Sequence, residues 1–260
     1  MDCDFVLRSV AAQDAVKHLT IVCVVLARDR MDNIRNEFTK IYRRHLWGGT
    51  TSKSGPGSDP ELLRAYADLL MGFIRQRNIR SVVDIGCGDW ALGRTLDWTG
   101  VDYTGVDIVP DVIETLQATY GSGNVRFACR DLISDELPSA ELCVIKDVLQ
   151  HLSNDSVKRF LSTLATHFQT ALITNDISHR KQGNWRTLWK TEVIEANSNA
   201  ANGGYRPLRL TEAPFNLPAT RLLTIPLRWY FGATHFERLV FDHPGTVYET
   251  KEVLLWERGA

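Results

Sequence analysis

The sequence lacks an excess of charge of either sign and lacks any stretch that concentrates basic residues. It contains 30 Lys and Arg against 31 Asp and Glu, which gives a formal net charge of −1 at pH 7. A groove that follows a phosphate backbone needs Lys and Arg gathered on one face. We therefore expect no nucleic acid among the partners of this protein.

Cysteine is sparse, and the five cysteines form no Cys-x-x-Cys pair. Most of them stand inside apolar runs, where a thiol behaves as a small hydrophobic side chain. They are Cys3, Cys23, Cys87, Cys129 and Cys143. This usage predicts a reduced, cytoplasmic protein without structural zinc.

Long hydrophobic runs are missing as well. The apolar stretch at residues 19–27 is much shorter than the ~20 residues of a membrane-spanning helix, and charged residues 28–30 follow it at once. No small-x-small cleavage pattern follows this stretch. We expect no membrane partner.

What the sequence does contain is an alternation of strand-length apolar runs with helical patterns after Arg80, which is typical of a doubly wound parallel sheet. We expect strands at residues 81–85, 103–107, 125–129, 142–145 and 171–174, with a closing strand at 253–256. We expect helices at residues 31–42, 59–73, 90–98 and 157–168, and one that starts at Pro110. Residues 207–218 read as a long loop, which in a compact domain is more often functional than idle.

A glycine-rich turn follows the first expected strand. Gly86 and Gly88 have no Cβ, so the backbone can turn tightly and approach a ligand while the next helix presents its free N–H groups. Asp84 stands two residues before the first glycine. Asp107 ends the next strand, where a carboxylate can accept both hydroxyls of a ribose, as in dinucleotide-binding folds. Asp131 follows the third strand and can accept an adenine amino group.

Two other interpretations of this turn stay open. It could be an ordinary connection between a strand and a helix. Residues 86–91 also satisfy the G-x-G-x-x-A fingerprint of nicotinamide dehydrogenases. Asp84, Asp131 and the lack of a recognisable second, substrate-binding domain argue against a dehydrogenase.

Four segments resemble, in order and spacing, the motifs of the class I S-adenosylmethionine-dependent methyltransferase family. They are residues 83–88, 105–107, 130–132 and 143–147. The resemblance covers residues 80–176. It implies an α/β fold in which a Rossmann-like, mainly parallel, seven-stranded sheet is flanked by helices.

The resemblance also implies S-adenosylmethionine as cofactor. Asp84 and Gly86 would line its methionine end, Asp107 would hold the ribose, and Asp131 and Leu132 would flank the adenine. Further cofactor contacts are expected at Cys87, Gly88, Ile108 and Lys146.

The N-terminal region is similar to a flap found in a bacterial subgroup of this family. Some members of that subgroup look like sugar or polysaccharide O-methyltransferases, and the mycobacterial methylmannose pathway is one possible home. The flap residues expected to cover the cofactor are Tyr42, Trp47, Gly48 and Ser54. The implied organisation is an N-terminal extension and flap at residues 1–58 and a methyltransferase domain at 59–260, with a cofactor-binding core at 80–176 and a substrate region at 177–260.

The catalytic residues are expected just past the fourth strand, on the edge of the sheet where ligands bind in open α/β folds. Methyl transfer is an in-line displacement, so much of the catalysis is positioning. A hydroxyl is a weak nucleophile, and a histidine with an ordinary pKa of ~6.5 suits its activation. We expect His151 to be this base and Asp147 to orient it or to contact the substrate. The alternative is that His151 merely caps or packs a turn.

A divalent cation is a further alternative, because carboxylate and imidazole are suitable ligands. It would be held by Asp147, His151 and Asp176, although no ligand-spacing motif supports it. A non-catalytic module that binds the cofactor also stays open.

Substrate contacts are expected from Asp176 and from the irregular C-terminal part, at Tyr205, Arg206 and Phe215. Aromatic faces beside hydrogen-bonding groups suit a sugar, although Phe215 could instead pack on the sheet. No N/D-P-P-Y motif occurs, which argues against an amino acceptor. We therefore predict methyl transfer to a hydroxyl of a small polar acceptor, a sugar or oligosaccharide, with a phenol or another small metabolite as the alternative. A monomer or homodimer is expected.

Overall fold

The computed structural model describes residues 34–47, 52–60, 63–178, 181–183, 191–193, 195–229 and 247–259. Expectations about residues 1–33 and Gly48 therefore lie outside the described residues. Among the described helices, none is both long and apolar enough to cross a membrane. The division of the chain at residue 58 stays a prediction.

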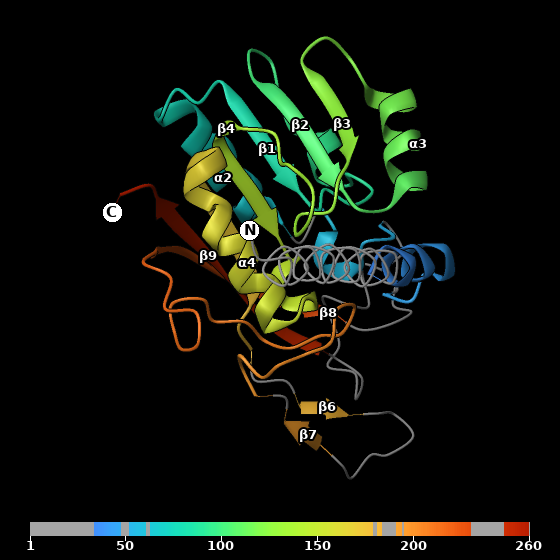
Figure 1. Cartoon of the computed structure of the whole chain (residues 1–260), viewed down its shortest axis with the longest axis vertical. Coiled ribbons are helices and arrows are strands. Elements are labelled where there is room, and N and C mark those ends of the chain that lie inside the picture. The colour runs from blue at the N-terminus through green and yellow to red at the C-terminus, as the bar shows by residue number, and fades with distance from the viewer. Residues whose placement is uncertain are drawn as a thin grey trace, which may run out of the picture.

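Seven strands form one sheet in the order β3-β2-β1-β4-β5-β9-β8, as Figure 1 shows. The strands are β1 Ser81–Ile85, β2 Asp102–Asp107, β3 Val125–Cys129, β4 Ala140–Lys146, β5 Phe168–Asp176, β8 Thr220–Trp229 and β9 Val247–Glu257. Strands β1 to β5 pair with one another in parallel, whereas β9 is antiparallel to both β5 and β8. The predicted mainly parallel, seven-stranded sheet is confirmed.

Four helices and several short elements complete the described fold. The helices are α2 Arg64–Gln76, α3 Pro110–Tyr120 and α4 Asn154–His167, and residues 34–44 are also helical. Single 3-10 turns occur at η1 Pro56–Ser58, η2 Gly93–Thr95 and η3 Leu149–His151. Strands β6 Lys181–Gly183 and β7 Thr191–Val193 pair in a separate two-stranded sheet.

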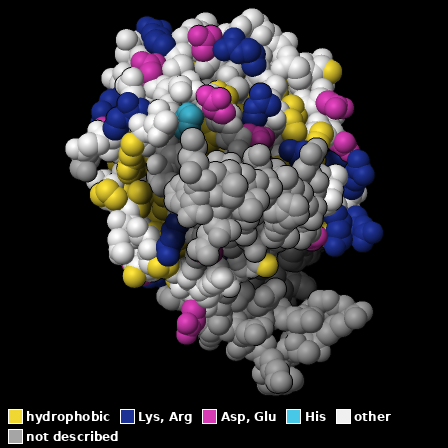
Figure 2. All heavy atoms as spheres, in the orientation of Figure 1, with side chains coloured by type: hydrophobic (Ala, Val, Ile, Leu, Met, Phe, Trp, Pro, Cys, Tyr) yellow, Lys and Arg dark blue, Asp and Glu magenta, His cyan; other side chains and the backbone are white. Residues whose placement is uncertain are grey.

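The sheet has a hydrophobic core on each face. Val82 packs in one core with residues of α2 and α3, while its neighbour Val83 packs in the other core with residues of α4 and of the helix at 34–44. Figure 1 shows α4 in front of the sheet. Because strands buried on both faces need apolar side chains on both, the parallel strands read as continuous apolar runs. On the part of the described surface that Figure 2 shows, acidic and basic side chains are interspersed.

The helix predicted at residues 90–98 is wrong, because this segment forms only the single turn η2. Trp90 adopts a left-handed φ of 56°, which interrupts a right-handed helix at its first residue. Its ring packs 5.6 Å from Tyr103 and 5.0 Å from Phe127, measured between centroids. Burial of this ring therefore decides the local backbone, and the expected helix N-terminus beside the glycine turn is absent.

Two helix starts also differ from expectation. The helix expected from Asp59 begins at Arg64, and Asp59 is buried. The helix expected from Val157 begins at Asn154, and Ser153 caps it by accepting a hydrogen bond from the N–H of Ser156. Both helices start at other residues than expected, but their apolar faces still pack on the sheet as expected.

Candidate active site

A cavity of about 490 Å³ lies at the edge of the sheet where the parallel strands end. It is lined by the residues that follow β1, β2, β3 and β4, as expected for an open α/β fold. Most predicted site residues meet there: Tyr42, Trp47, Ser54, Asp84, Gly86, Cys87, Asp107, Ile108, Asp131, Leu132, Lys146, Asp147, His151 and Tyr205. Segments that are distant in sequence thus form one cavity.

The turn after β1 requires glycine at two positions. Gly86 has a φ of +70° and Gly88 a φ of +57°, a region that side-chain-bearing residues rarely adopt. A Cβ at Gly86 would lie 2.2 Å from a methyl carbon of Val148, and one at Gly88 would lie 2.2 Å from Oγ of Ser54. Gly86 lines the cavity, whereas Gly88 packs under the flap.

Asp107 stabilises the glycine turn and keeps free capacity for a ligand. Its two carboxylate oxygens accept hydrogen bonds from the backbone N–H groups of Gly88 (3.1 Å) and Val109 (3.0 Å). Burial raises the pKa of Asp107, although these N–H groups oppose the shift. A carboxylate has about four lone-pair positions, so roughly two are left for ribose hydroxyls.

Asp131 carries a polar atom without a partner. Its Oδ1 accepts a hydrogen bond from the N–H of Ile133 at 2.8 Å, whereas its Oδ2 is buried and has no hydrogen-bond partner. Buried polar atoms are normally paired, so an unpaired one in a cavity wall fits a missing ligand donor. An adenine amino group is such a donor, and Leu132 lines the cavity beside it.

The side chain of Asp84 lies on the face of the sheet that α2 covers. The hydroxyl of Tyr103 donates a hydrogen bond of 2.7 Å to its Oδ2. Burial raises the pKa of Asp84 to about 6, although Tyr103 and the ammonium group of Lys146 oppose this. A cationic ligand such as an amino group would stabilise the ionised carboxylate there.

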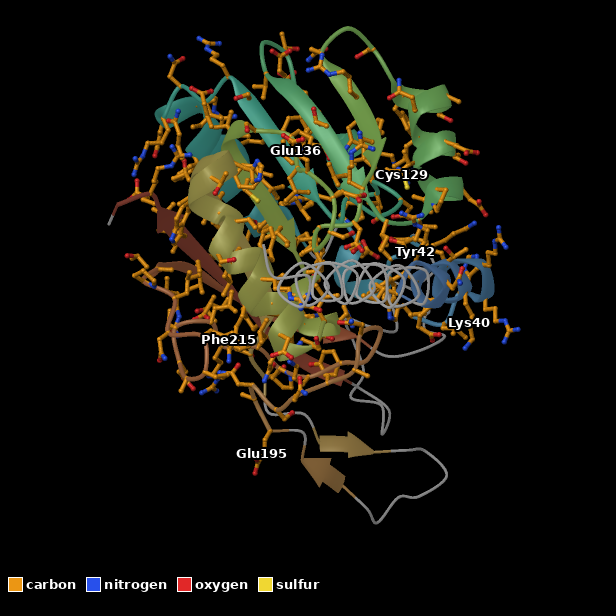
Figure 3. All side chains as sticks on the ribbon, in the orientation of Figure 1. Lys40, Tyr42, Cys129, Glu136, Glu195 and Phe215 are labelled. Carbon is orange, nitrogen blue, oxygen red and sulfur yellow. The ribbon has the colours of Figure 1, made fainter. Side chains whose placement is uncertain are left out.

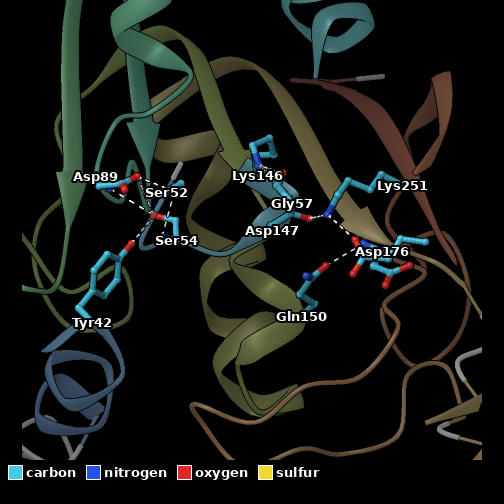
Figure 4. Close-up of polar contacts among 11 residues, drawn as sticks. Tyr42, Ser52, Ser54, Gly57, Asp89, Lys146, Asp147, Gln150, Asp176 and Lys251 are labelled. Carbon is cyan, nitrogen blue, oxygen red and sulfur yellow. Dashed lines mark hydrogen bonds and ion pairs between the residues drawn. The ribbon is translucent and has the colours of Figure 1, made fainter. Parts of the chain in front are cut away.

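Asp89 binds the flap to the glycine turn through hydrogen bonds. The sequence analysis did not predict this role of Asp89. Its carboxylate accepts hydrogen bonds from Ser52 Oγ (2.8 Å), the N–H of Lys53 (2.7 Å) and Ser54 Oγ (3.1 Å). The hydroxyls of Ser54 and Tyr42 lie 2.7 Å apart (Figure 4). The sequence feature that could have predicted this role is the position of Asp89 directly after the last glycine of the turn.

His151 lies between two aromatic rings, with its ring centroid 5.1 Å from that of Trp47 and 5.9 Å from that of Tyr205. Its Nδ1 lies 2.7 Å from the carbonyl oxygen of Gly204. A carbonyl only accepts, so Nδ1 carries the proton and Nε2 of the neutral ring has a free lone pair. Burial lowers the pKa of His151 to about 4, against the opposing effect of the Gly204 bond. The imidazole is therefore neutral at pH 7.

Asp147 belongs to a buried cluster of charges. Its Oδ2 accepts a hydrogen bond from Lys146 Nζ (2.8 Å) and its Oδ1 one from Lys251 Nζ (2.6 Å), and Lys251 also lies 3.5 Å from Glu249. Burial would raise the pKa of Asp147, but the two ammonium groups lower it to about 2. Asp147 does not hold the His151 ring, because a backbone carbonyl does so. Lys251 and Glu249 were not predicted.

The cation hypothesis finds no support in these positions. Asp147 is bound by lysines, and Asp176 accepts hydrogen bonds from the hydroxyls of Ser178 and Tyr205. In the part of the chain that the structure describes, no group of three or more His, Cys, Asp or Glu side chains could hold a metal ion.

The predicted substrate residues divide into two groups. Tyr205 lines the cavity, and the fully buried Asp176 accepts a hydrogen bond of 2.5 Å from its hydroxyl. Arg206 does not line the cavity, because its buried guanidinium donates to the carbonyl of Leu149 and the side chain of Asn154. Phe215 packs against the core and lies well apart from the flap residue Tyr42 in Figure 3.

Comparison with known proteins gives one family match. Residues 82–171 match the family model of a methyltransferase domain. The matched segment carries β1 to β4 and the glycine turn. The match agrees with S-adenosylmethionine as the cofactor. No protein of curated function matches the chain in sequence.

Several solved structures are similar to this chain at low sequence identity. TehB from Haemophilus influenzae has a TM-score of 0.50 and 12% identity, over 77% of this chain and 67% of that one. Human N-acetylserotonin methyltransferase has a TM-score of 0.44 and 15% identity, over 70% and 48%. The N-methyltransferase NodS from Bradyrhizobium japonicum has a TM-score of 0.45 and 11% identity, over 78% and 89%. This chain thus spans about half the length of the human enzyme.

Proposed function

We propose that this protein transfers a methyl group from S-adenosylmethionine to a hydroxyl of a small polar acceptor, with His151 as the general base. The observation that carries the proposal is the fixed tautomer of His151. The carbonyl of Gly204 holds the Nδ1 proton, so that Nε2 can accept a proton in the cavity that the glycine turn and Asp131 also line.

The described residues fit the cofactor. Asp84 would hold the amino group of its methionine part, Asp107 the ribose hydroxyls, and the unpaired Oδ2 of Asp131 the adenine amino group. Gly86, Cys87, Ile108, Leu132 and Lys146 would complete the walls, with Tyr42, Trp47 and Ser54 as the covering flap. When bound, S-adenosylmethionine supplies a methyl group on a sulfonium centre.

The acceptor would lie on the His151 side of the cavity. Nε2 of His151 takes the hydroxyl proton as the oxygen attacks, and the carbonyl of Gly204 stabilises the imidazolium that results. Asp147 remains ionised, and each of its oxygens keeps a lone pair that can accept a hydrogen bond from the acceptor. Tyr205, held by Asp176, would face the acceptor.

The class of acceptor is proposed from the aromatic rings of Trp47 and Tyr205, whose flat faces beside polar groups suit a sugar or oligosaccharide. A phenol is the second candidate, and the lowered pKa of His151 favours it, because a weak base deprotonates an acidic hydroxyl more readily. Cytoplasmic location, and a monomer or homodimer, stay predictions.

Calorimetry with S-adenosylhomocysteine and with NAD tests the cofactor assignment. We expect micromolar binding of S-adenosylhomocysteine and none of NAD, and the reverse result would overturn the proposal in favour of an oxidoreductase. A screen with methyl-labelled S-adenosylmethionine across sugars and phenols then tests the reaction. Binding of S-adenosylhomocysteine without methyl transfer to any hydroxyl compound would favour a non-catalytic module.

A further inference from the structure

Lys251 joins two parts of the molecule that are far apart in the sequence. It lies on β9, 104 residues after Asp147, and its side chain is only 2% exposed. In the register of the sheet Lys251 pairs with Asp176 at the end of β5. Because β9 runs antiparallel to β5, this residue arrives at the edge where the parallel strands end. Its ammonium group thereby reaches the carboxylate at the end of β4.

The flap rests on the same charged cluster. Nζ of Lys146 donates a hydrogen bond of 3.2 Å to the carbonyl oxygen of Gly57. A Cβ at Gly57 would lie 3.1 Å from Nζ of Lys251 and 3.6 Å from Oδ2 of Asp147. The flap is therefore held by hydrogen bonds at two places, at Asp89 on the glycine turn and at Lys146 at the end of β4, and Gly57 lies close against Lys251 (Figure 4).

The four charged side chains stabilise one another, because each buried charge needs an opposite charge beside it. Lys146 and Lys251 balance Asp147 and Glu249, and a buried ion that loses its partner is strongly destabilised. Asp147 also has a left-handed φ of 60°, a conformation that persists only where its surroundings hold it. Its bonds to the two lysines provide such a restraint.

We propose that Lys251 is a positioning residue that couples closure of the flap to the wall of the cavity beside the acceptor. It holds the Asp147 carboxylate and offers the surface on which Gly57 docks. The flap and the cavity wall at Asp147 therefore become ordered in one step. Loss of the Lys251 ammonium group makes both of them more mobile. This inference rests on the proposed function for its consequence in turnover, but the coupling itself exists without an acceptor.

The test uses hydrogen exchange of the flap amides at residues 52–60 in the full chain, with and without S-adenosylhomocysteine. We expect Lys251→Met to speed this exchange about 10-fold or more and Lys251→Arg to restore most of the protection. A carboxyl signal of Asp147 in ¹³C NMR should titrate at higher pH in Lys251→Met, because one of its two cations is gone. Lys158→Met, at an exposed position on α4, is the matched control and should change neither readout.

Gly57→Val tests the same contact from the flap and keeps the test open if Lys251→Met does not fold. Its matched control is Gly123→Val, since a Cβ at Gly123 has no neighbour within 4 Å. Gly57→Val should speed flap exchange and shift the Asp147 signal, whereas Gly123→Val should do neither. Unchanged flap exchange in both Lys251→Met and Gly57→Val would overturn the inference. Failure of the unmodified protein to bind S-adenosylhomocysteine would instead overturn the proposed function.

Discussion

The Nδ1 atom of His151 lies 2.7 Å from the carbonyl oxygen of Gly204. The two residues are 53 positions apart, and their contact decides which nitrogen of the imidazole can accept a proton. A second backbone bond, from the N–H of Gly203 to the carbonyl of His151, holds the same two segments together at 2.8 Å. The orientation of the proposed base thus comes from a loop of the C-terminal region, whereas Asp147 is bound by two lysines.

Replacement of His151 by Gln should lower the turnover number by about 10² to 10⁴, which is the usual contribution of a general base. The affinity for S-adenosylhomocysteine should stay within about threefold, because His151 contacts the acceptor side of the cavity. Steady-state kinetics and calorimetry measure the two effects. His167→Gln, on α4 and outside the cavity, should leave both values unchanged. Full activity of His151→Gln at saturating acceptor would show that His151 is not the base.

The pH dependence of kcat/KM should reflect the lowered pKa of His151. With a pKa of about 4 the imidazole is already neutral at pH 6, so kcat/KM should stay level through pH 6.5 and fall only below about pH 5. An initial-rate profile with a midpoint near 6.5 would contradict this.

The lowered pKa of His151 should also appear in the pH dependence of the free energy of unfolding, when the unmodified protein is compared with His151→Gln. Between about pH 4 and 6.5 unfolded His151 binds more protons than folded His151, so its contribution to the free energy of unfolding falls as the pH falls. Asp84, with a raised pKa of about 6, acts in the opposite direction. Denaturant melts of the unmodified protein and of His151→Gln should therefore diverge with pH in this window, and parallel curves would argue against a buried, neutral imidazole.

Asp131→Ala should weaken binding of S-adenosylhomocysteine about 10-fold or more, because one hydrogen bond to a charged group contributes about 1.5–3 kcal/mol. Calorimetry with S-inosylhomocysteine, which lacks the adenine amino group, completes a double-mutant cycle. Asp131→Ala should change the affinity for this analogue only slightly. Asp102→Ala, at the start of β2, is the control. An equal loss with both ligands would show that Asp131 does not contact the amino group.

Asp89→Ala should speed release of S-adenosylhomocysteine about 10-fold or more, because the flap loses three hydrogen bonds to one carboxylate. Stopped-flow measurement of tryptophan fluorescence can follow release, since Trp47 lines the cavity. Asp97→Ala, at an exposed position in the segment after η2, should behave as the unmodified protein. Release at an unchanged rate from Asp89→Ala would contradict the role of the flap as a cover.

Local patterns were enough to determine the sheet and the glycine turn. The five parallel strands were predicted because burial on both faces demands apolar runs. The turn was predicted because Gly86 and Gly88 lack a Cβ, and the structure gives both a left-handed φ. Asp107 and Asp131 were predicted as ligand contacts because they stand at or just after strand ends, and Asp84 because of the resemblance to the methyltransferase family. All three line the cavity. The match at residues 82–171 covers this same segment.

Contacts between distant segments were decided only by the tertiary structure. The helix expected at residues 90–98 is absent because burial of Trp90 between rings from β2 and β3 sets its backbone conformation. Lys251 reaches Asp147 only because β9 runs antiparallel beside β5, and strand β8 itself was not predicted. The sequence by itself thus determined the glycine turn and the carboxylates that line the cavity, since these depend on residue types at fixed local positions. The surroundings of the base and the closure of the flap depend on chain reversals, which no local spacing encodes.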